Sequence, residues 1–172
     1  AAQQQQARAA LERSVEQVKS VLGEVRRISH DLRPALLDDL GLAAALDYLA
    51  SEFGRDSATP VRFRSEGPMD GLPEMAGTVL FRIAQEALTN VERHAGARQV
   101  EMRLVRRGRC LSLSIADDGS GFDAQDIARH PQRGIGLRNM MERMEAIGGR
   151  LAIDSSPLGT RVAASIDLKE QT

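Results

Sequence analysis

The first part of the chain carries apolar residues at alternating steps of four and three, the spacing that predicts a long helix with one apolar seam. The positions of this seam are Leu11, Val15, Val18, Leu22, Val25, the small Ser29 and Leu32. Pro34 ends the helix, because the residue before a proline is disfavoured in the helical conformation. A long helix with a single seam needs a partner surface. We therefore expect residues 1–36 to be one helix of a bundle.

Beyond residue 36 the pattern changes between helical and strand spacing. Helical spacing predicts helices at Ala43–Phe53, Pro73–His94 and Leu137–Ile147. Period-two spacing predicts strands at Val61–Arg64, Gln99–Val105, Cys110–Ala116, Arg150–Asp154 and Thr160–Leu168. Strands that occur in runs, with helices set apart from them, favour the α+β class. We expect residues 37–172 to form a two-layer α/β sandwich, with helices on one face of a mixed sheet.

Composition narrows the class of protein. An apolar fraction of 42% and a charged fraction of 27% are typical of a folded domain, and a net charge of −1 argues against direct nucleic-acid binding. The single cysteine, Cys110, lies in an alternating apolar run, which predicts a buried structural thiol. No apolar run approaches the ~20 residues of a membrane span, and we expect no signal peptide. We expect a cytoplasmic fragment whose parent protein could carry a membrane anchor elsewhere.

Polar residues suited to chemistry stand in three groups. Glu86 and Asn90 are four residues apart on the predicted long helix, with Arg93 and His94 on the next turn. All four can therefore share one face of that helix. The other two groups are the glycine-containing runs Asp117–Gly121 and Gly134–Leu137.

Each group suits one part of a nucleotide. A pair of glycines at the start of a helix lets backbone N–H groups bind phosphate, and the helix dipole helps. An asparagine oxygen suits Mg²⁺, which also bridges phosphates. A carboxylate at a strand end can accept from an exocyclic amine, which selects adenine over guanine. Singly, each group is more often a turn or a solvated helix face, but their order along one chain favours an ATP site.

Four segments of the chain resemble motifs of the ATPase fold shared by histidine kinases, gyrase, MutL and a heat-shock chaperone, and a fifth resembles a junction upstream of that fold. Phe81–Ala95 resembles the N box, and Leu158–Arg161 resembles the closing Gly-Thr element. Ile115–Phe122 and Arg133–Met144 are similar to the two glycine boxes. Upstream, Leu32–Leu46 resembles the junction found in sensor histidine kinases that pair with LuxR-type (NarL-type) response regulators. The resemblance covers nearly the whole chain and implies the ATP-binding catalytic region of such a kinase.

On the long helix, the resemblance implies catalytic and metal-binding roles. Asn90 would ligate Mg²⁺. Glu86 would be the N-box acid that polarises or positions the attacking group, and it is a second candidate ligand for the metal. Arg93 would contact phosphate, and His94 would line the nucleotide pocket.

In the glycine boxes, the resemblance implies recognition of the base and of the phosphates. Asp117 would hold the adenine amino group, and Thr160 would join it through its hydroxyl or a water. Gly119 and Gly121 would give the backbone room to approach. Gly134 and Gly136 would flank the triphosphate, and Ile135 and Leu137 beside them would also belong to the nucleotide site. The two glycines would form the base of a mobile lid at about residues 123–133.

The resemblance also implies a reaction and partners: transfer of the ATP γ-phosphoryl to a histidine, and relay to an aspartate of a LuxR-type response regulator. His30 superficially resembles an acceptor, but the segment between His30 and Asn90 has no room for the second bundle helix that would follow an acceptor helix. We therefore expect the acceptor upstream of this chain, and residues 1–36 to be the second dimerisation helix, through which the chain self-associates. His130 falls in the expected lid, where a surface role is favoured.

Three other functions fit parts of the sequence. An ATP-binding regulatory module would bind nucleotide without transfer, although Glu86, Asn90 and Asp117 argue against decay of the site. A serine kinase of the same ATPase fold would share the glycine boxes but not the Leu32–Leu46 junction. A dimerisation scaffold would explain the first helix and none of the glycine-box residues.

Overall fold

The computed structural model describes residues 35–57, 59–123 and 134–168. These residues belong to a compact unit that begins at Pro34. The bundle helix predicted for residues 1–34 and most of the expected lid, residues 124–133, lie outside the described residues, as do His30 and His130.

Five strands form one mixed sheet in the order β1-β2-β3-β5-β4. Their bounds are β1 Val61–Glu66, β2 Val100–Arg107, β3 Cys110–Asp117, β4 Arg150–Ser156 and β5 Gly159–Asp167. β1 pairs with β2 in parallel, and the other neighbouring strands pair antiparallel. All five strands were predicted from the period-two spacing, and their observed bounds differ from the predicted ones by at most two residues at either end.

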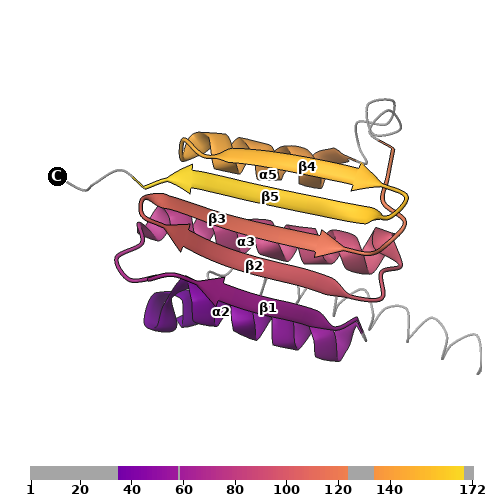
Figure 1. Ribbon diagram of the computed structural model, residues 1–172, viewed down its shortest axis with the longest axis horizontal. Coiled ribbons are helices and arrows are strands. Elements are labelled where there is room, and N and C mark those ends of the chain that lie inside the picture. Colours follow the sequence, from indigo (N-terminus) through magenta and orange to yellow (C-terminus); the bar gives the residue numbers. More distant parts are fainter. Residues whose placement is uncertain (1–34, 58, 124–133, 169–172) are drawn as a thin grey trace, which may run out of the picture. The chain divides into compact units, whose positions relative to one another are not determined.

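The helices cover one face of this sheet (Figure 1). Their bounds are α2 Ala35–Asp56, α3 Glu74–Asn90, the wide π-helical turn η1 Val91–Ala95 and α5 Ile135–Ala146. Alternate residues of the central strands point at the helices and are buried: Val100, Met102, Leu104, Leu111, Leu113, Ile115, Val162, Ala164 and Ile166. The predicted α+β class, with helices on one face of a mixed sheet, is therefore confirmed. Within the described ranges, no helix has the length and apolar character that crossing a bilayer requires.

The first described helix differs from its prediction. Helical spacing predicts Ala43–Phe53, whereas α2 runs from Ala35 to Asp56 and is interrupted by non-helical angles at Gly41 (φ 81°, ψ 175°). Leu37 and Leu42, on either side of this interruption, are both buried in the core. The burial of both leucines explains why the segment before Gly41 is also helical, because most helical stability in proteins comes from packing of the apolar face.

The prediction for Cys110 is wrong, because the thiol is exposed. Successive side chains of a strand point to opposite faces. Leu111 faces the helices and is fully buried, so its neighbour Cys110 faces the uncovered side of the sheet. The alternation was correctly recognised, but its phase at the first residue of β3 was not.

Candidate functional site

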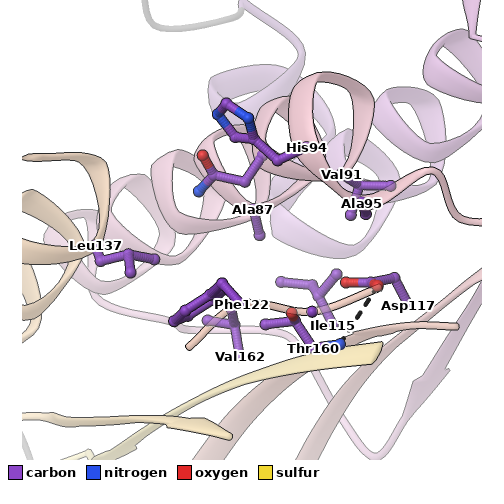
Figure 2. Close-up of a pocket in the computed structure, with 12 residues that line it drawn as sticks. Ala87, Val91, His94, Ala95, Ile115, Asp117, Phe122, Leu137, Thr160 and Val162 are labelled. Carbon is purple, nitrogen blue, oxygen red and sulfur yellow. Dashed lines mark hydrogen bonds between the residues drawn. The ribbon is translucent and has the colours of Figure 1, made fainter. Parts of the chain in front are cut away.

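A cavity of about 410 Å³ lies between the end of α3 and the strands β3 and β5 (Figure 2). The residues that line it are Ala87, Asn90, Val91, His94, Ala95, Ile115, Asp117, Gly121, Phe122, Leu137, Thr160 and Val162. Most of them are apolar, and a few polar groups converge on the space, as is typical of a small-molecule site. In Figure 2, Asp117 lies at one end of the cavity and Leu137, from the start of α5, at the other.

The helical side of this cavity is formed where α3 changes into the wide turn η1. Single π-helical turns within α-helices occur often at functional sites. Asn90 and His94 line the cavity from this side, as do the buried Val91 and Ala95. Arg93 is exposed and is not among the lining residues. Of the four residues of the predicted helix face, Asn90 and His94 thus line the cavity, and Glu86 and Arg93 do not.

The carboxylate of Asp117 is held in a fixed orientation at its end of the cavity. Its Oδ1 atom accepts hydrogen bonds from the backbone N–H of Gly119 at 2.8 Å and from that of Thr160 at 3.3 Å. No hydrogen bond from the described residues reaches its other oxygen, Oδ2. Asp117 therefore keeps one carboxylate oxygen available to a ligand in the cavity.

The glycines around Asp117 allow backbone segments to approach one another closely. A Cβ atom at Gly119 would collide with the carbonyl of Ala95, and one at Gly121 would collide with that of Ser156. Gly121 also has a positive φ of 60°, which side chains other than glycine rarely adopt. The room that these glycines provide is thus filled by the protein's own backbone. Gly119 lines a second, more polar hollow, to which His94 also contributes.

Asp118, which follows the pocket carboxylate, has a different role. Its Oδ1 accepts from the backbone N–H of Arg98 at 2.7 Å and from that of Gln99 at 3.0 Å. Hydrogen bonds from these two amides, Gln99 first and then Arg98, hold the pKa of the Asp118 carboxyl below its usual range. Asp118 therefore joins the end of β3 to the start of β2. The sequence analysis did not assign it this role, although two adjacent acids at a strand end must point in different directions.

Glu86 lies against the start of α5. A Cβ atom at Gly136 would collide with the Oε1 atom of the Glu86 carboxylate, so the absence of a side chain at Gly136 makes room for Glu86. Of the four nucleotide-binding residues predicted in Gly134–Leu137, only Leu137 lines the cavity. Gly134 is buried at the helix start, and Ile135 is 53% exposed.

The sequence analysis missed the apolar walls of the cavity and one hydroxyl behind it. The missed walls are Ala87, Val91, Ala95, Ile115, Phe122 and Val162. Except for Phe122, which follows β3, these residues lie at helical or strand spacing that marks them as core, and such spacing cannot distinguish a core position from a cavity wall. Ser155 does not line the cavity, but its Oγ atom accepts from the backbone N–H of Phe122 at 2.8 Å and lies 3.1 Å from Oγ1 of Thr160.

Relatives with known names share this chain's sequence over most of its length. It is 42% identical over 154 residues to the sensor histidine kinase MctS of Rhizobium johnstonii. The aligned region covers 90% of this chain and 33% of MctS. It is 37% identical over 152 residues to the histidine-protein kinase/phosphatase DegS of Brevibacillus brevis, covering 88% of this chain and 39% of DegS. It is 40% identical over 148 residues to UhpB of Salmonella typhimurium, and the aligned part covers 85% of this chain and 28% of UhpB. The chain thus spans about a third of the length of these relatives.

Solved structures show the same fold at lower sequence identity. The histidine kinase domain of a blue-light activated kinase from Erythrobacter litoralis matches with a TM-score of 0.60 at 23% identity, over 76% of this chain and 66% of that one. The histidine kinase AdeS of Acinetobacter baumannii matches with a TM-score of 0.62 at 16% identity, over 89% of this chain and 84% of AdeS.

The family itself is recognised over residues 76–170, more than half of the chain, which match the histidine kinase-, DNA gyrase B-, and HSP90-like ATPases. This match contains α3 from Ala76 onward, the segments that resemble the two glycine boxes, and every residue that lines the cavity. The chain therefore belongs to the histidine kinase-, DNA gyrase B-, and HSP90-like ATPase family, and it is homologous to the catalytic ATP-binding domains of sensor histidine kinases.

Proposed function

We propose that this chain binds ATP with Mg²⁺ and directs transfer of the γ-phosphoryl to a histidine, as the catalytic region of a longer sensor kinase. The observation that carries the proposal is the Asp117 carboxylate, which is held by two backbone N–H groups at one end of a largely apolar cavity. The names of the relatives, all sensor or signal-transduction histidine kinases, support the same assignment.

The cavity fits a purine base at the Asp117 end. Apolar side chains from α3 and from the sheet, such as Val91 and Ile115, form walls against which a flat ring can pack. The available Oδ2 atom of Asp117 is an acceptor, and it suits the exocyclic amine of adenine. The oxygen of guanine at the same position would be repelled by the carboxylate.

The opposite end of the cavity, where α5 begins, suits the phosphates. The start of α5 has no hydrogen bond from a side-chain cap at Gly134, so its first backbone N–H groups can donate to an anion. Asn90 lines the cavity, and Glu86 reaches the first turn of α5. These two residues would hold the Mg²⁺ ion together with the phosphates, and the ion would neutralise charge during transfer.

The described residues contain no group of three or more His, Cys, Asp or Glu side chains that could hold a metal by themselves. This is compatible with Mg²⁺, which is commonly bound by one or two protein groups, phosphates and water. The part of the chain in transfer is then to position the groups and to exclude water. We propose that Glu86 orients the attacking nitrogen, that Arg93 contacts phosphate and that His94 lines the nucleotide site.

The proposed partners belong to the whole kinase. The acceptor histidine would lie upstream of this chain, residues 1–36 would contribute to self-association, and the phosphoryl group would pass to a LuxR-type response regulator. The resemblance of Leu32–Leu46 to the junction of such kinases supports this pairing. A cytoplasmic location follows from the same proposal, because ATP and response regulators are found there.

The first experiment is calorimetry of the chain with ATP, ADP and GTP, with and without Mg²⁺. We expect ATP and ADP to bind and GTP to bind far more weakly. Asp117→Asn should weaken ATP binding about 10- to 100-fold, because a hydrogen bond to a charged group contributes about 1.5–3 kcal/mol. Asp154→Asn, at an exposed position of β4, makes the same chemical change away from the cavity and should bind like the wild type.

Equal binding of GTP and ATP, or unchanged ATP binding by Asp117→Asn, would contradict the assignment of the base site. Transfer is tested in the parent kinase with γ-labelled ATP, where Asn90→Ala should abolish labelling of histidine. Binding of ATP without any transfer would instead support the regulatory module.

A further inference from the structure

Ser155 lies outside the cavity, and its hydroxyl joins two residues that line it. Its Oγ atom accepts a hydrogen bond from the backbone N–H of Phe122 at 2.8 Å. The same atom lies 3.1 Å from Oγ1 of Thr160, so one of the two hydroxyls donates to the other. Both Phe122 and Thr160 line the cavity, and Figure 2 shows Thr160 beside Asp117. Ser155 is thus placed to influence the base end of the site without contacting a ligand.

The direction of the bond between the hydroxyls follows from counting donors and acceptors. A serine hydroxyl has one hydrogen to donate and two lone pairs. Ser155 already accepts from Phe122, and within the described ranges its hydroxyl has no acceptor partner other than Thr160. If Ser155 donates to Thr160, the hydroxyl hydrogen left without a partner among the described residues is that of Thr160, which lines the cavity and can reach a ligand or solvent there. In the reverse direction the hydrogen of Ser155 would have no partner, which is costly at a shielded position.

This direction fixes what Thr160 can offer to a ligand. Its Oγ1 accepts from Ser155, so its own hydrogen is left to donate into the cavity that it lines. Beside it, Asp117 offers the acceptor Oδ2, because Oδ1 is occupied by two backbone N–H groups, one of them from Thr160 itself. The protein therefore presents an acceptor next to a donor. Adenine has the complementary pair, an amine beside a ring nitrogen, whereas guanine has an oxygen beside a protonated nitrogen.

We propose that Ser155 is a positioning residue for base specificity, which orients the Thr160 hydroxyl so that it donates to the base beside Asp117. This inference rests on the proposed binding of ATP. It assigns a role to a serine outside the cavity, and it predicts that Ser155 acts on the base only through Thr160.

The test is a double-mutant cycle measured by calorimetry with ATP. Removing one neutral hydrogen bond should cost roughly fivefold in affinity for Ser155→Ala and roughly tenfold for Thr160→Val. Because the two residues act as one unit, the double variant should bind about tenfold more weakly than the wild type. Independent effects would multiply to about fiftyfold. Ser155→Thr, which keeps the hydroxyl, should bind ATP with an affinity within about twofold of that of the wild type.

Ser156→Ala is the matched control. Its hydroxyl accepts from the backbone N–H of Leu158 at 3.2 Å in the same hairpin, whereas the hydrogen bonds to Phe122 and to the Thr160 hydroxyl are made by Ser155. This variant should bind ATP like the wild type. A loss equal to that of Ser155→Ala would assign the effect to general weakening of the hairpin and would overturn the inference.

A second measurement needs no nucleotide. Hydrogen exchange of the Phe122 amide should be about tenfold faster in Ser155→Ala than in the wild type, because its only acceptor in the described structure is lost. Unchanged exchange would overturn the hydrogen bond from Phe122 to Ser155 on which the inference depends.

The outcomes of the binding measurements separate this inference from the proposed function. If the wild type binds ATP but the two losses in affinity multiply, Ser155 does not act through Thr160, and the proposed function stands without this inference. A wild type that binds no ATP would overturn both.

Discussion

At the scale of single residues, the site depends on side chains whose neighbours are remote in sequence. The Glu86 carboxylate occupies the space that a side chain at Gly136 would fill. Asp117 and Asp118 are adjacent, yet one faces the cavity and the other accepts from the amides of Arg98 and Gln99. The residue types alone predicted that these acids and glycines belong to a nucleotide site. Their contacts in the structure determine which acid faces the cavity and which one joins two strands.

Gly136→Ala tests the contact with Glu86. The added methyl group would meet Oε1 of Glu86, which is the far end of a flexible side chain, so the carboxylate would move rather than the backbone. We expect a change of less than about 1 kcal/mol in the free energy of unfolding, because the side chain can give way. Phosphoryl transfer in the parent kinase should fall by about 100-fold, because a small misplacement of a catalytic group is costly.

The measurements for this variant are urea unfolding of the chain and histidine labelling of the parent kinase. Gly148→Ala is not a suitable control, because its φ of 70° makes any side chain strained. The control is Ala146→Gly, the reverse exchange of the same two residue types at an exposed position at the end of α5. It should leave labelling of histidine intact. Equal labelling by wild type and Gly136→Ala would show that the position of Glu86 is unimportant for transfer.

At the scale of elements, glycines decide where helices bend and where they pack. Gly41 interrupts α2 with φ 81° and ψ 175°, angles that are accessible almost only to glycine. Gly77 lies within α3, where the nearest atom to an added Cβ would be Cδ1 of Leu37 at 3.8 Å, an ordinary contact. The same substitution at the two positions should therefore have opposite effects.

Gly41→Ala should lower the free energy of unfolding by about 1–3 kcal/mol, because the native angles are strained for alanine. Gly77→Ala should raise it by about 0.5–1 kcal/mol, because alanine favours the helix interior. Both values are measured by urea unfolding of the chain. Destabilisation of similar size by both variants would show that the angles at Gly41 are not required by the fold.

At the scale of the whole molecule, stability depends on hydrogen bonds that join neighbouring strands of the sheet, such as those that Asp118 accepts. Asp118 joins the end of β3 to the start of β2 and has a pKa below its usual range, chiefly because of the amides of Gln99 and Arg98. A carboxyl with a lowered pKa in the folded state stabilises the fold above its unfolded pKa of about 3.9. This contribution is lost as the pH falls through the folded pKa.

Asp118→Asn should therefore be less stable than the wild type at neutral pH, and the difference should shrink as the pH falls below about 4. Thermal unfolding midpoints of both proteins across this range measure the effect. Asp154→Asn, at an exposed position of β4, is the matched control and should show a small difference at every pH. A constant difference between Asp118→Asn and the wild type would show that ionisation of Asp118 is not involved.

Periodicity predicted every described strand and the class of the fold, because hydrophobic spacing is a local property of the sequence. It failed where phase or packing decides. Cys110 is exposed because it lies on the other face from Leu111. The segment before Gly41 is helical, and its Leu37 is buried against the rest of the domain. Spacing also could not show that Val91 and Ile115 border a cavity rather than solid core.

The sequence by itself determined the order of the motifs, the types of the elements and the family, because these depend on residue types at fixed spacings. Only the tertiary structure decided which residues meet. It brings Glu86 to Gly136, Asp118 to Arg98 and Ser155 to Phe122. It also leaves Arg93 outside the cavity. These contacts join segments far apart in the chain, and they arise from the packing of the helices and the pairing of the strands, which no local pattern encodes.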